Sequence, residues 1–317
     1  VSYEGPAVKS MQRVYWLVRI WDNNSKVTDW SEPAFWEMGI LEPESWKASW
    51  ITLGNEPEKE GSKPAHYYRK EFQLKKKVKS ARVYVTSHGL YQLFLNEKKV
   101  GTDLFTPGWT SYNKRLQYQT YDVTSMLKDK NSVGAILGDG WYRGTIGKNR
   151  KENKYYYGDK LALLEQLQID YTDGTSETVP TDQSWKVSTG AIIESDIYNG
   201  EIYDARKEMK GWNQSGFDES KWENVTVVSQ SKDILVAQRG VPVKAIQEIK
   251  PVRLIRTPKG ETVFDMGQNM VGWVRLKVQG KKGDQITLKF AEVLDKEGNF
   301  YTENLRSGSI QGKYGVV

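Results

Sequence analysis

Short runs in which apolar and polar residues alternate extend along most of this 317-residue chain. In the run WVRLKVQG, Val274, Leu276 and Val278 point to one side and polar side chains point to the other. A half-buried antiparallel strand has this period of two, whereas an amphipathic helix repeats every about 3.6 residues. Turn residues at Asp173–Thr175 and Glu297–Asn299 predict hairpins between such runs. The chain is therefore predicted to be an all-β protein.

Further segments follow the same period, and one short segment departs from it. Asp122 or Thr124 can cap a first helical turn in VTSMLK, so a short helix is predicted there. The basic cluster Lys75–Lys79 lies between two apolar runs and is predicted to be a solvated turn. The further strand segments are ARVYVTS, YQLFLN, ALLEQLQIDY and ITLKFAEVL. So little helix predicts packed antiparallel β-sandwiches.

Changes in composition along the chain predict three units. Residues 1–44 carry two aromatic runs, VYWLVRIWD and WSEPAFW, which are typical of the last two strands of a fibronectin-like domain. Two strands alone are not stable, so this unit packs on a neighbour or lacks its beginning. Residues 45–235 are long enough for a jelly-roll sandwich. Residues 236–317 begin a second β-sandwich that has no clear closing strand.

Composition limits the chemistry that the chain can perform. The absence of cysteine excludes disulfides and thiolate zinc sites, and a catalytic triad or a histidine-containing metal site would need His66 or His88. The net charge is +6, but acidic residues are interspersed among the basic ones, which argues against a nucleic-acid partner. No apolar run is long enough to span a bilayer. Val1–Tyr3 has no leader pattern, which predicts a missing or processed N-terminus.

Six motifs identify a family that the chain resembles. They occur in the order and approximate spacing found in bacterial α-L-rhamnosidases of glycoside hydrolase family 78, and the match covers nearly the whole chain. Each motif alone is weak, but six in sequence are specific. The motifs are GLYQLFLNEKKVG, FTPGWTSYNKR, YDVTSML, GDGWYRG, NGEIYDAR and FDMGQNMVGW.

The resemblance implies a modular parent protein. Its modules are a fibronectin-like domain, a jelly-roll domain, a second β-sandwich, an (α/α)6 barrel with the catalytic carboxylates, and a C-terminal β domain. This chain resembles the end of the first module, all of the second and the start or most of the third, so it is predicted to end before the barrel. An inverting glycosidase needs two carboxyl groups about 6.5–9.5 Å apart around a water. Such a pair normally lies at the mouth of a barrel or deep cleft, and no helical barrel can be predicted from these 317 residues. We therefore assign no catalytic residue.

The resemblance also implies partners and a location. The expected ligand is a glycan or glycoside that carries terminal α-L-rhamnose, and the expected protein partner is the missing catalytic domain of the same polypeptide. The kinship implies export to the periplasm or the cell surface. This expectation rests on the resemblance alone, since the sequence shows no signal-peptide pattern. Some jelly-roll domains of the family bind rhamnose with calcium, so Ca²⁺ is the one cofactor considered. No metal ligand is assigned.

Two tryptophan-containing motifs are candidates for carbohydrate binding. The chain has 12 Trp, 18 Tyr and 8 Phe, and the flat C–H faces of sugars stack on such rings. In GDGWYRG, Trp141 can stack on a sugar while Asp139 and Arg143 bond its hydroxyls; alternatively the glycines form a bulge and the ring packs between sheets. In FTPGWTSY, Trp109 follows a Pro-Gly turn and either meets a ligand or covers a core edge.

Two further motifs carry clustered polar side chains. Glu201, Asp204 and Arg206 of NGEIYDAR could form a sugar or calcium site, an Asp–Arg structural pair, or a contact with the missing barrel. In FDMGQNMVGW, the amides of Gln268 and Asn269 could serve a ligand, but support of a β-bulge is the favoured interpretation.

Three functional hypotheses remain at this point. The first is a non-catalytic part of an α-L-rhamnosidase that supports the catalytic domain and holds a sugar weakly, with a stand-alone carbohydrate-binding module as its variant. The second is a self-sufficient β-sandwich glycosidase whose acid and base are a pair such as Asp139 and Glu201. The third, ranked last, is a basic module for nucleic acid or anionic glycans, which rests on the sequence pI near 9.0 and the KKKVK cluster.

Overall fold

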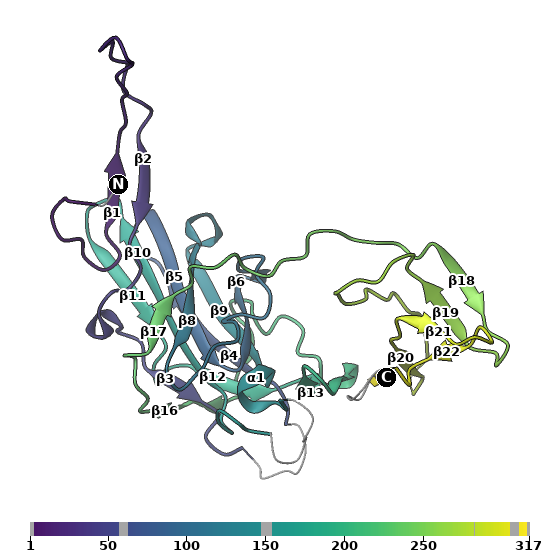
Figure 1. Cartoon of the computed structure of the whole chain (residues 1–317). Coiled ribbons are helices and arrows are strands. Elements are labelled where there is room, and N and C mark those ends of the chain that lie inside the picture. Colours follow the sequence, from purple (N-terminus) through teal and green to yellow (C-terminus); the bar gives the residue numbers. More distant parts are fainter. Residues whose placement is uncertain (1–2, 57–62, 147–153, 282, 305–310, 316–317) are drawn as a thin grey trace.

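The computed structural model describes residues 3–56, 63–146, 154–281, 283–304 and 311–315 (Figure 1). These residues form strands with only short helical turns, which confirms the predicted all-β class. A two-sheet sandwich occupies the middle of the chain, a hairpin precedes it, and smaller sheets follow it. Such layers form because each sheet has an apolar face that must be buried. Among the described residues, no helix has the length and apolarity needed to cross a bilayer.

The first sheet of the sandwich has seven strands in the order β16-β3-β10-β5-β8-β17, and β11 also pairs with β10. Its pairs are antiparallel except for that of β8 with β17. Strands β5 and β10 form the longest ladder, and they are the two central strands of the sheet. The strands are β3 (Trp50–Thr52), β5 (Val78–His88), β8 (Leu116–Asp122), β10 (Ala162–Tyr171), β11 (Ser176–Pro180), β16 (Thr226–Val228) and β17 (Leu235–Ala237).

The second sheet has six strands in the order β15-β12-β4-β9-β6-β7. All of its pairs are antiparallel. Strands far apart in the sequence are therefore neighbours, as a jelly-roll-like sandwich requires. The strands are β4 (His66–Gln73), β6 (Leu90–Leu95), β7 (Lys98–Lys99), β9 (Lys130–Gly138), β12 (Lys186–Thr189) and β15 (Glu223–Asn224).

The main hydrophobic core contains apolar residues from both sheets. Leu163 and Leu167 of β10 and Val85 of β5 are buried in the same cluster as Leu93 of β6. Burying each such side chain contributes about 1.5–3 kcal/mol. The alternation of β10 also places Glu165 between the two leucines on this face. That carboxyl is fully buried, so a charged group would be costly there.

A second core covers the outer face of the first sheet and is rich in aromatic rings. Trp50 of β3 and Tyr118 of β8 are buried in it. The Tyr118 hydroxyl accepts a hydrogen bond from the Ile40 N–H at 2.6 Å and donates to the Ile40 carbonyl oxygen at 3.1 Å. These bonds attach the segment that follows the N-terminal hairpin to the sandwich.

The N-terminal hairpin consists of β1 (Arg13–Trp16) and β2 (Ala34–Glu37), which are antiparallel. Its two strands correspond to the two aromatic runs of the sequence. Glu37 bonds Arg13 within the hairpin at 2.7 Å and also pairs with Arg82 of β5 at 3.1 Å. The hairpin is therefore tied to the sandwich by a shared carboxylate.

The C-terminal region forms smaller sheets, and Figure 1 shows most of its strands set apart from the sandwich beyond an extended segment. Two antiparallel pairs are β18 with β19 and β21 with β22, and a four-stranded sheet has the order β13-β14-β23-β20. Strand β14 pairs in parallel with β23, so the hairpin β13–β14 joins this region to the middle of the chain. The strands are β13 (Ile192–Asp196), β14 (Gly200–Asp204), β18 (Arg253–Arg256), β19 (Thr262–Asp265), β20 (Gln285–Lys289), β21 (Val293–Leu294), β22 (Phe300–Tyr301) and β23 (Gln311–Gly315).

One strand prediction is wrong and one helix prediction needs correction. No strand is present in WVRLKVQG, and Val274, Leu276 and Val278 are all exposed. Alternation predicts which side chains share a face, but a strand also needs a partner ladder, which these residues lack. The helix predicted in VTSMLK is a single 3₁₀ turn, η2 (Thr124–Met126), in which Asp122 Oδ1 accepts a hydrogen bond from the Thr124 N–H at 3.0 Å.

The predicted turns are confirmed. Asp173 Oδ1 accepts a bond from the Thr175 N–H at 2.9 Å between β10 and β11, and Gly174 between them adopts a positive φ. The KKKVK cluster leads from β4 into β5: Lys75, Lys76 and Lys77 are exposed as predicted, but Val78 and Lys79 already belong to β5. Two further 3₁₀ turns are η1 (Pro43–Ser45) and η3 (Ala205–Lys207).

Candidate functional site

The motif GDGWYRG forms a helical turn at the end of β9, the helix α1 (Gly140–Arg143). This corrects the predicted β-bulge. Gly140 has a φ of +52°, and a Cβ at this position would lie 2.4 Å from Leu90 Cγ, so glycine is required on both counts. Because successive helical side chains point in different directions, the turn sends Trp141, Tyr142 and Arg143 to three different environments.

Trp141 belongs to an aromatic surface that we define by Phe105, Trp109, Trp141 and Tyr157. The rings of Trp109 and Trp141 are nearly parallel, 5.5 Å apart between centroids and 8° between planes. The ring centroids of Phe105 and Trp141 lie 5.8 Å apart, and the Trp109 indole N–H donates to the Tyr157 hydroxyl at 3.3 Å. Phe105 and Trp109 are both about half exposed. The structure thus brings together two of the candidate residues, Trp109 from a loop and Trp141 from α1.

Rings in mutual contact connect this surface to the second core. Tyr157 contacts Tyr112, and Tyr112 contacts Tyr142. Tyr142 stacks on His88 with 4.4 Å between ring centroids and 6° between planes, and His88 stacks on Trp50 with 4.5 Å between centroids. Burial lowers the pKa of His88 to about 4, so its ring is neutral at pH 7. The aromatic surface is therefore the outer end of a continuous column of ring contacts.

Arg143 lies at the opposite side of α1 in a buried cluster of charges. Its side chain has no exposed surface, and its Nε donates to Asp139 Oδ1 at 2.6 Å. It also bonds Glu56 and donates to the carbonyl oxygen of Pro64 at 3.0 Å. Asp139 is 1% exposed. The structure thus places these two candidate residues beneath the surface, where they anchor α1.

Glu56 and His66 also belong to this buried cluster, and their contacts determine which of them is charged. Burial alone would raise the pKa of Glu56, but the bond from His66 and the charge of Arg143 lower it to about 2. Burial lowers the pKa of His66 itself, so the imidazole is neutral. Since ionised Glu56 only accepts, His66 Nε2 donates to it at 2.9 Å, and His66 Nδ1 accepts from the Tyr68 hydroxyl at 3.1 Å.

The remaining candidates, Glu201 and Asp204, lie on β14, away from the aromatic surface. Asp204 pairs with Arg206 at 2.8 Å, which fits the predicted Asp–Arg structural pair. Glu201 borders an apolar cavity of about 560 Å³ that includes Trp273 and Leu288, and burial raises its pKa. Within the described residues, no three His, Asp or Glu side chains are grouped as a metal site. Calcium binding stays a prediction.

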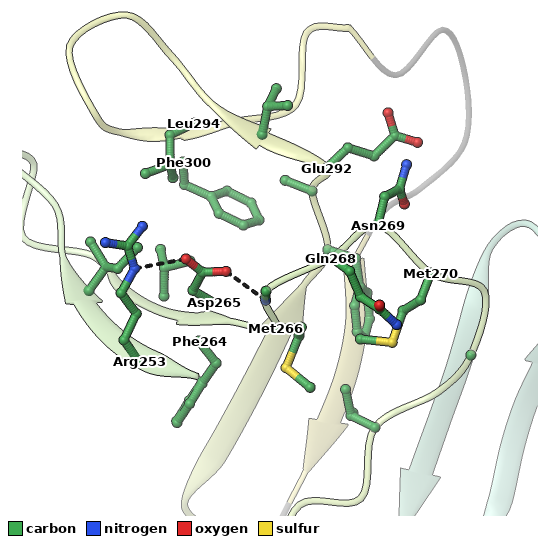
Figure 2. A pocket seen from close by; sticks show the side chains of 18 of the residues that line it. Arg253, Phe264, Asp265, Met266, Gln268, Asn269, Met270, Glu292, Leu294 and Phe300 are labelled. Carbon is green, nitrogen blue, oxygen red and sulfur yellow. Dashed lines mark hydrogen bonds and ion pairs between the residues drawn. The ribbon is translucent and has the colours of Figure 1, made fainter. Parts of the chain in front are cut away.

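A second cavity, of about 660 Å³, lies in the C-terminal region and contains the FDMGQNMVGW motif (Figure 2). Asp265 accepts a bond from the Gly267 N–H at 2.8 Å and pairs with Arg253 at 2.8 Å, and these two contacts lower its pKa. Figure 2 shows Glu292 directed away from Asp265. No hydrogen bond joins the amides of Gln268 or Asn269 to the described part of the chain, so the structure gives no support for their predicted role at a bulge.

Several residues of the site escaped prediction from the sequence. Glu56, His66 and Tyr157 lie outside the motifs, and their roles depend on contacts between distant segments. His66 carried one signal, because it begins a strand whose neighbours are aromatic. Nothing local marks Tyr157 among three consecutive tyrosines as the partner of Trp109.

Three family models match the chain in succession. They are the Rha78A-like N-terminal immunoglobulin domain over residues 1–42, the α-L-rhamnosidase N-terminal domain over residues 76–247, and the bacterial α-L-rhamnosidase concanavalin-like domain over residues 255–316. The aromatic surface and Arg143 lie within the second of these matches.

Known proteins give the same assignment. An α-L-rhamnosidase of Alteromonas sp. is 39% identical over 97% of this chain and 34% of its own length, and one of Streptomyces avermitilis is 44% identical over 79% and 24%. The crystal structure of α-L-rhamnosidase from Aspergillus terreus superposes with a TM-score of 0.92 and 37% identity, over 98% of this chain and 36% of that one. This chain thus spans about a quarter to a third of the length of these relatives, and it belongs to the α-L-rhamnosidase family as an N-terminal portion.

Proposed function

We propose that this chain is the non-catalytic N-terminal portion of an enzyme that hydrolyses terminal α-L-rhamnose from glycans or glycosides. Its role is to support the catalytic domain that the longer relatives carry in addition. The observation that carries the proposal is the asymmetric coverage: nearly all of this chain aligns with about a third of the Alteromonas and Aspergillus terreus rhamnosidases.

The chemistry of the described residues supports a non-catalytic role. Inverting hydrolysis needs one protonated and one ionised carboxyl about 6.5–9.5 Å apart across a cleft. Among the described residues, Asp139 lines neither cavity, and Glu201 is the only acidic residue that borders the 560 Å³ cavity. In the larger cavity, the contacts of Asp265 lower its pKa, which is the wrong direction for a general acid. These placements disfavour a self-sufficient glycosidase built on Asp139 and Glu201.

The proposal includes the setting of the enzyme. Polymeric glycans lie outside the cytoplasm, so we place the parent protein in the periplasm or at the cell surface. A chain without cysteine is compatible with an oxidising compartment. The partner is the catalytic domain of the same polypeptide, and calcium is the cofactor to be tested.

The first experiment measures turnover of an aryl α-L-rhamnoside by the 317-residue chain, with the Alteromonas rhamnosidase as the positive control. We expect no turnover. The second replaces the matching third of the Alteromonas enzyme with this chain, and we expect the hybrid to retain activity. Robust turnover by the chain alone that Glu201→Gln abolishes would refute the non-catalytic role. An inactive, unfolded hybrid would refute the supporting role.

A further inference from the structure

The C-terminal region is connected to the sandwich by two different routes. The first is the segment 238–252 between β17 and β18, which Figure 1 shows as a single extended connection. Most of its side chains are exposed, and among the described residues the stretch 245–251 makes no backbone hydrogen bond to the sandwich. Such a connection tethers two domains without setting the angle between them. The angle therefore depends on the second route, the hairpin β13–β14.

This hairpin belongs to both parts of the molecule. At its base, the Ile192 carbonyl oxygen accepts a hydrogen bond from the Ala65 N–H at 3.0 Å, next to β4 of the sandwich. Along its outer edge, β14 pairs in parallel with β23, and β23 pairs with β20. Because hydrogen-bonded strands move together, any rotation of the hairpin about its base would carry this sheet with it. The attachment of the hairpin tip is thus the contact that can set the orientation.

The tip is attached to the sandwich by Asp196. This residue is 8% exposed, and its Oδ2 accepts a hydrogen bond from the Thr145 N–H, just after α1, at 2.9 Å. Its Oδ1 accepts from the N–H groups of Tyr198 and Asn199, both at 2.8 Å, which closes the hairpin turn. Asn199 Nδ2 also donates to Thr145 Oγ1 at 3.3 Å. One carboxylate therefore shapes the turn and bonds it to the sandwich, through the stronger hydrogen bonds that a charged acceptor makes.

Two glycines of the motif GDGWYRG leave room for the hairpin tip. A Cβ at Gly144 would lie 3.1 Å from Asp196 Oδ2, and a Cβ at Gly138 would lie 2.8 Å from Ser195 Oγ. Asn199 at the tip is the first residue of the motif NGEIYDAR. Two motifs that are far apart in the sequence thus meet where the hairpin is attached.

The turn that receives the tip is itself held in place. The guanidinium of Arg143 anchors α1 through the buried carboxylates of Asp139 and Glu56. Thr145 follows this anchored turn by two residues. The bond from Thr145 to Asp196 therefore joins the hairpin to a fixed point of the sandwich.

We infer that Asp196 is a positioning residue, which fixes the orientation of the C-terminal region relative to the sandwich by holding the tip of β13–β14 on Thr145. Without the carboxylate, the hairpin keeps its base and its ladder with β23, but its tip swings and the two regions sample a range of angles. In the parent enzyme, Asp196 thereby also sets the place of the catalytic domain. This last step rests on the proposed function, whereas the first rests on the geometry alone.

The test measures the distance between two nitroxide labels by pulsed electron paramagnetic resonance. Because the chain has no cysteine, the labels can be attached at Thr120→Cys on β8 and Thr287→Cys on β20, both at exposed positions. We expect a narrow distance distribution in the labelled chain and one about twice as wide after Asp196→Ala. Asp196→Asn should give an intermediate width, because its single amide oxygen cannot replace both carboxylate oxygens.

Asp204→Ala is the matched control, because Asp204 lies on the same hairpin but its side chain bonds the neighbouring Arg206. It should leave the distance distribution unchanged. Circular dichroism and thermal unfolding verify that each variant is folded, and Asp196→Asn decides if Asp196→Ala does not fold. A broad distribution before any change at Asp196, equal widths with and without the carboxylate, or loss of folding in both Asp196 variants overturns the inference.

The labels report on the 317-residue chain alone, so their result does not depend on the activity of the Alteromonas hybrid. Equal widths with an active hybrid refute only the role of Asp196. A widened distribution with an inactive hybrid supports that role and refutes only the supporting role. In an active hybrid, Asp196→Ala should lower kcat/KM and Asp204→Ala should not; equal values would refute the extension to the catalytic domain.

Discussion

Arg143 and Asp139 form an ion pair across one helical turn, with 2.6 Å between Nε and Oδ1, and neither side chain has more than 1% of its surface exposed. Trp141 lies between them in the sequence but reaches the aromatic surface. A single turn of helix thus combines a buried anchor with an outward-facing ring, and this explains why one short motif contains both charged and aromatic residues.

Arg143→Ala should destabilise the protein by about 3–5 kcal/mol, because it removes a buried guanidinium from beside two carboxylates. Denaturant unfolding at pH 7 measures the change. Arg206→Ala is the control: its pair with Asp204 has a largely exposed guanidinium, so no measurable change is expected. Equal stability of wild type and Arg143→Ala would show that the buried cluster is not an anchor.

Glu165 should make the protein less stable as the pH rises. Burial raises the pKa of this carboxyl well above its ordinary value of 4.5. The unfolded chain therefore releases its proton first, and above pH 4.5 stability falls by up to about 1.4 kcal/mol per pH unit until the folded pKa is reached. Glu165→Gln removes this dependence, as unfolding across a pH series would show. Asp170→Asn, at an exposed position of the same strand, should follow the wild-type profile, and a Glu165→Gln profile identical to wild type would contradict the prediction.

His88 should act in the opposite direction. Its folded pKa of about 4 lies below the ordinary value of 6.5, so stability is full above pH 6.5 and is lost as the pH falls towards 4. The loss is about 1.4 kcal/mol per pH unit in this interval. His88→Phe keeps a ring between Trp50 and Tyr142 but takes up no proton. The difference in stability between variant and wild type should therefore change between pH 7 and pH 4; a constant difference would refute the assignment.

Trp185→Ala should cost about 3–5 kcal/mol, because this fully buried ring belongs to the main core and its removal leaves a cavity. Its indole N–H also donates to the Pro180 carbonyl oxygen at 2.9 Å, which would lose a partner. Thermal and denaturant unfolding measure the effect. Trp30→Ala, at the surface of the hairpin, should change stability far less. Comparable losses in the two variants would mean that Trp185 is not a core residue.

Local pattern was sufficient to predict some of the strands of the sandwich and the turn between two of them. The segment ALLEQLQIDY is β10 over the same residues, and the turn at Asp173–Thr175 follows it as expected. It was not sufficient at WVRLKVQG, where alternation is clear but no partner strand pairs with the segment. Hydrogen-bonded pairing is a long-range property, so a local period can indicate a face without forming a ladder.

The sequence by itself determined the all-β class and the rhamnosidase family, because alternation, turn residues and ordered motifs are all properties of the chain read in one direction. Only the tertiary structure decided which motif residues are inside and which are outside. It buried Asp139 and Arg143 with Glu56, and it stacked Trp109 on Trp141. The physical reason is that burial and partner choice depend on segments far apart in the sequence, which meet only when the two sheets pack.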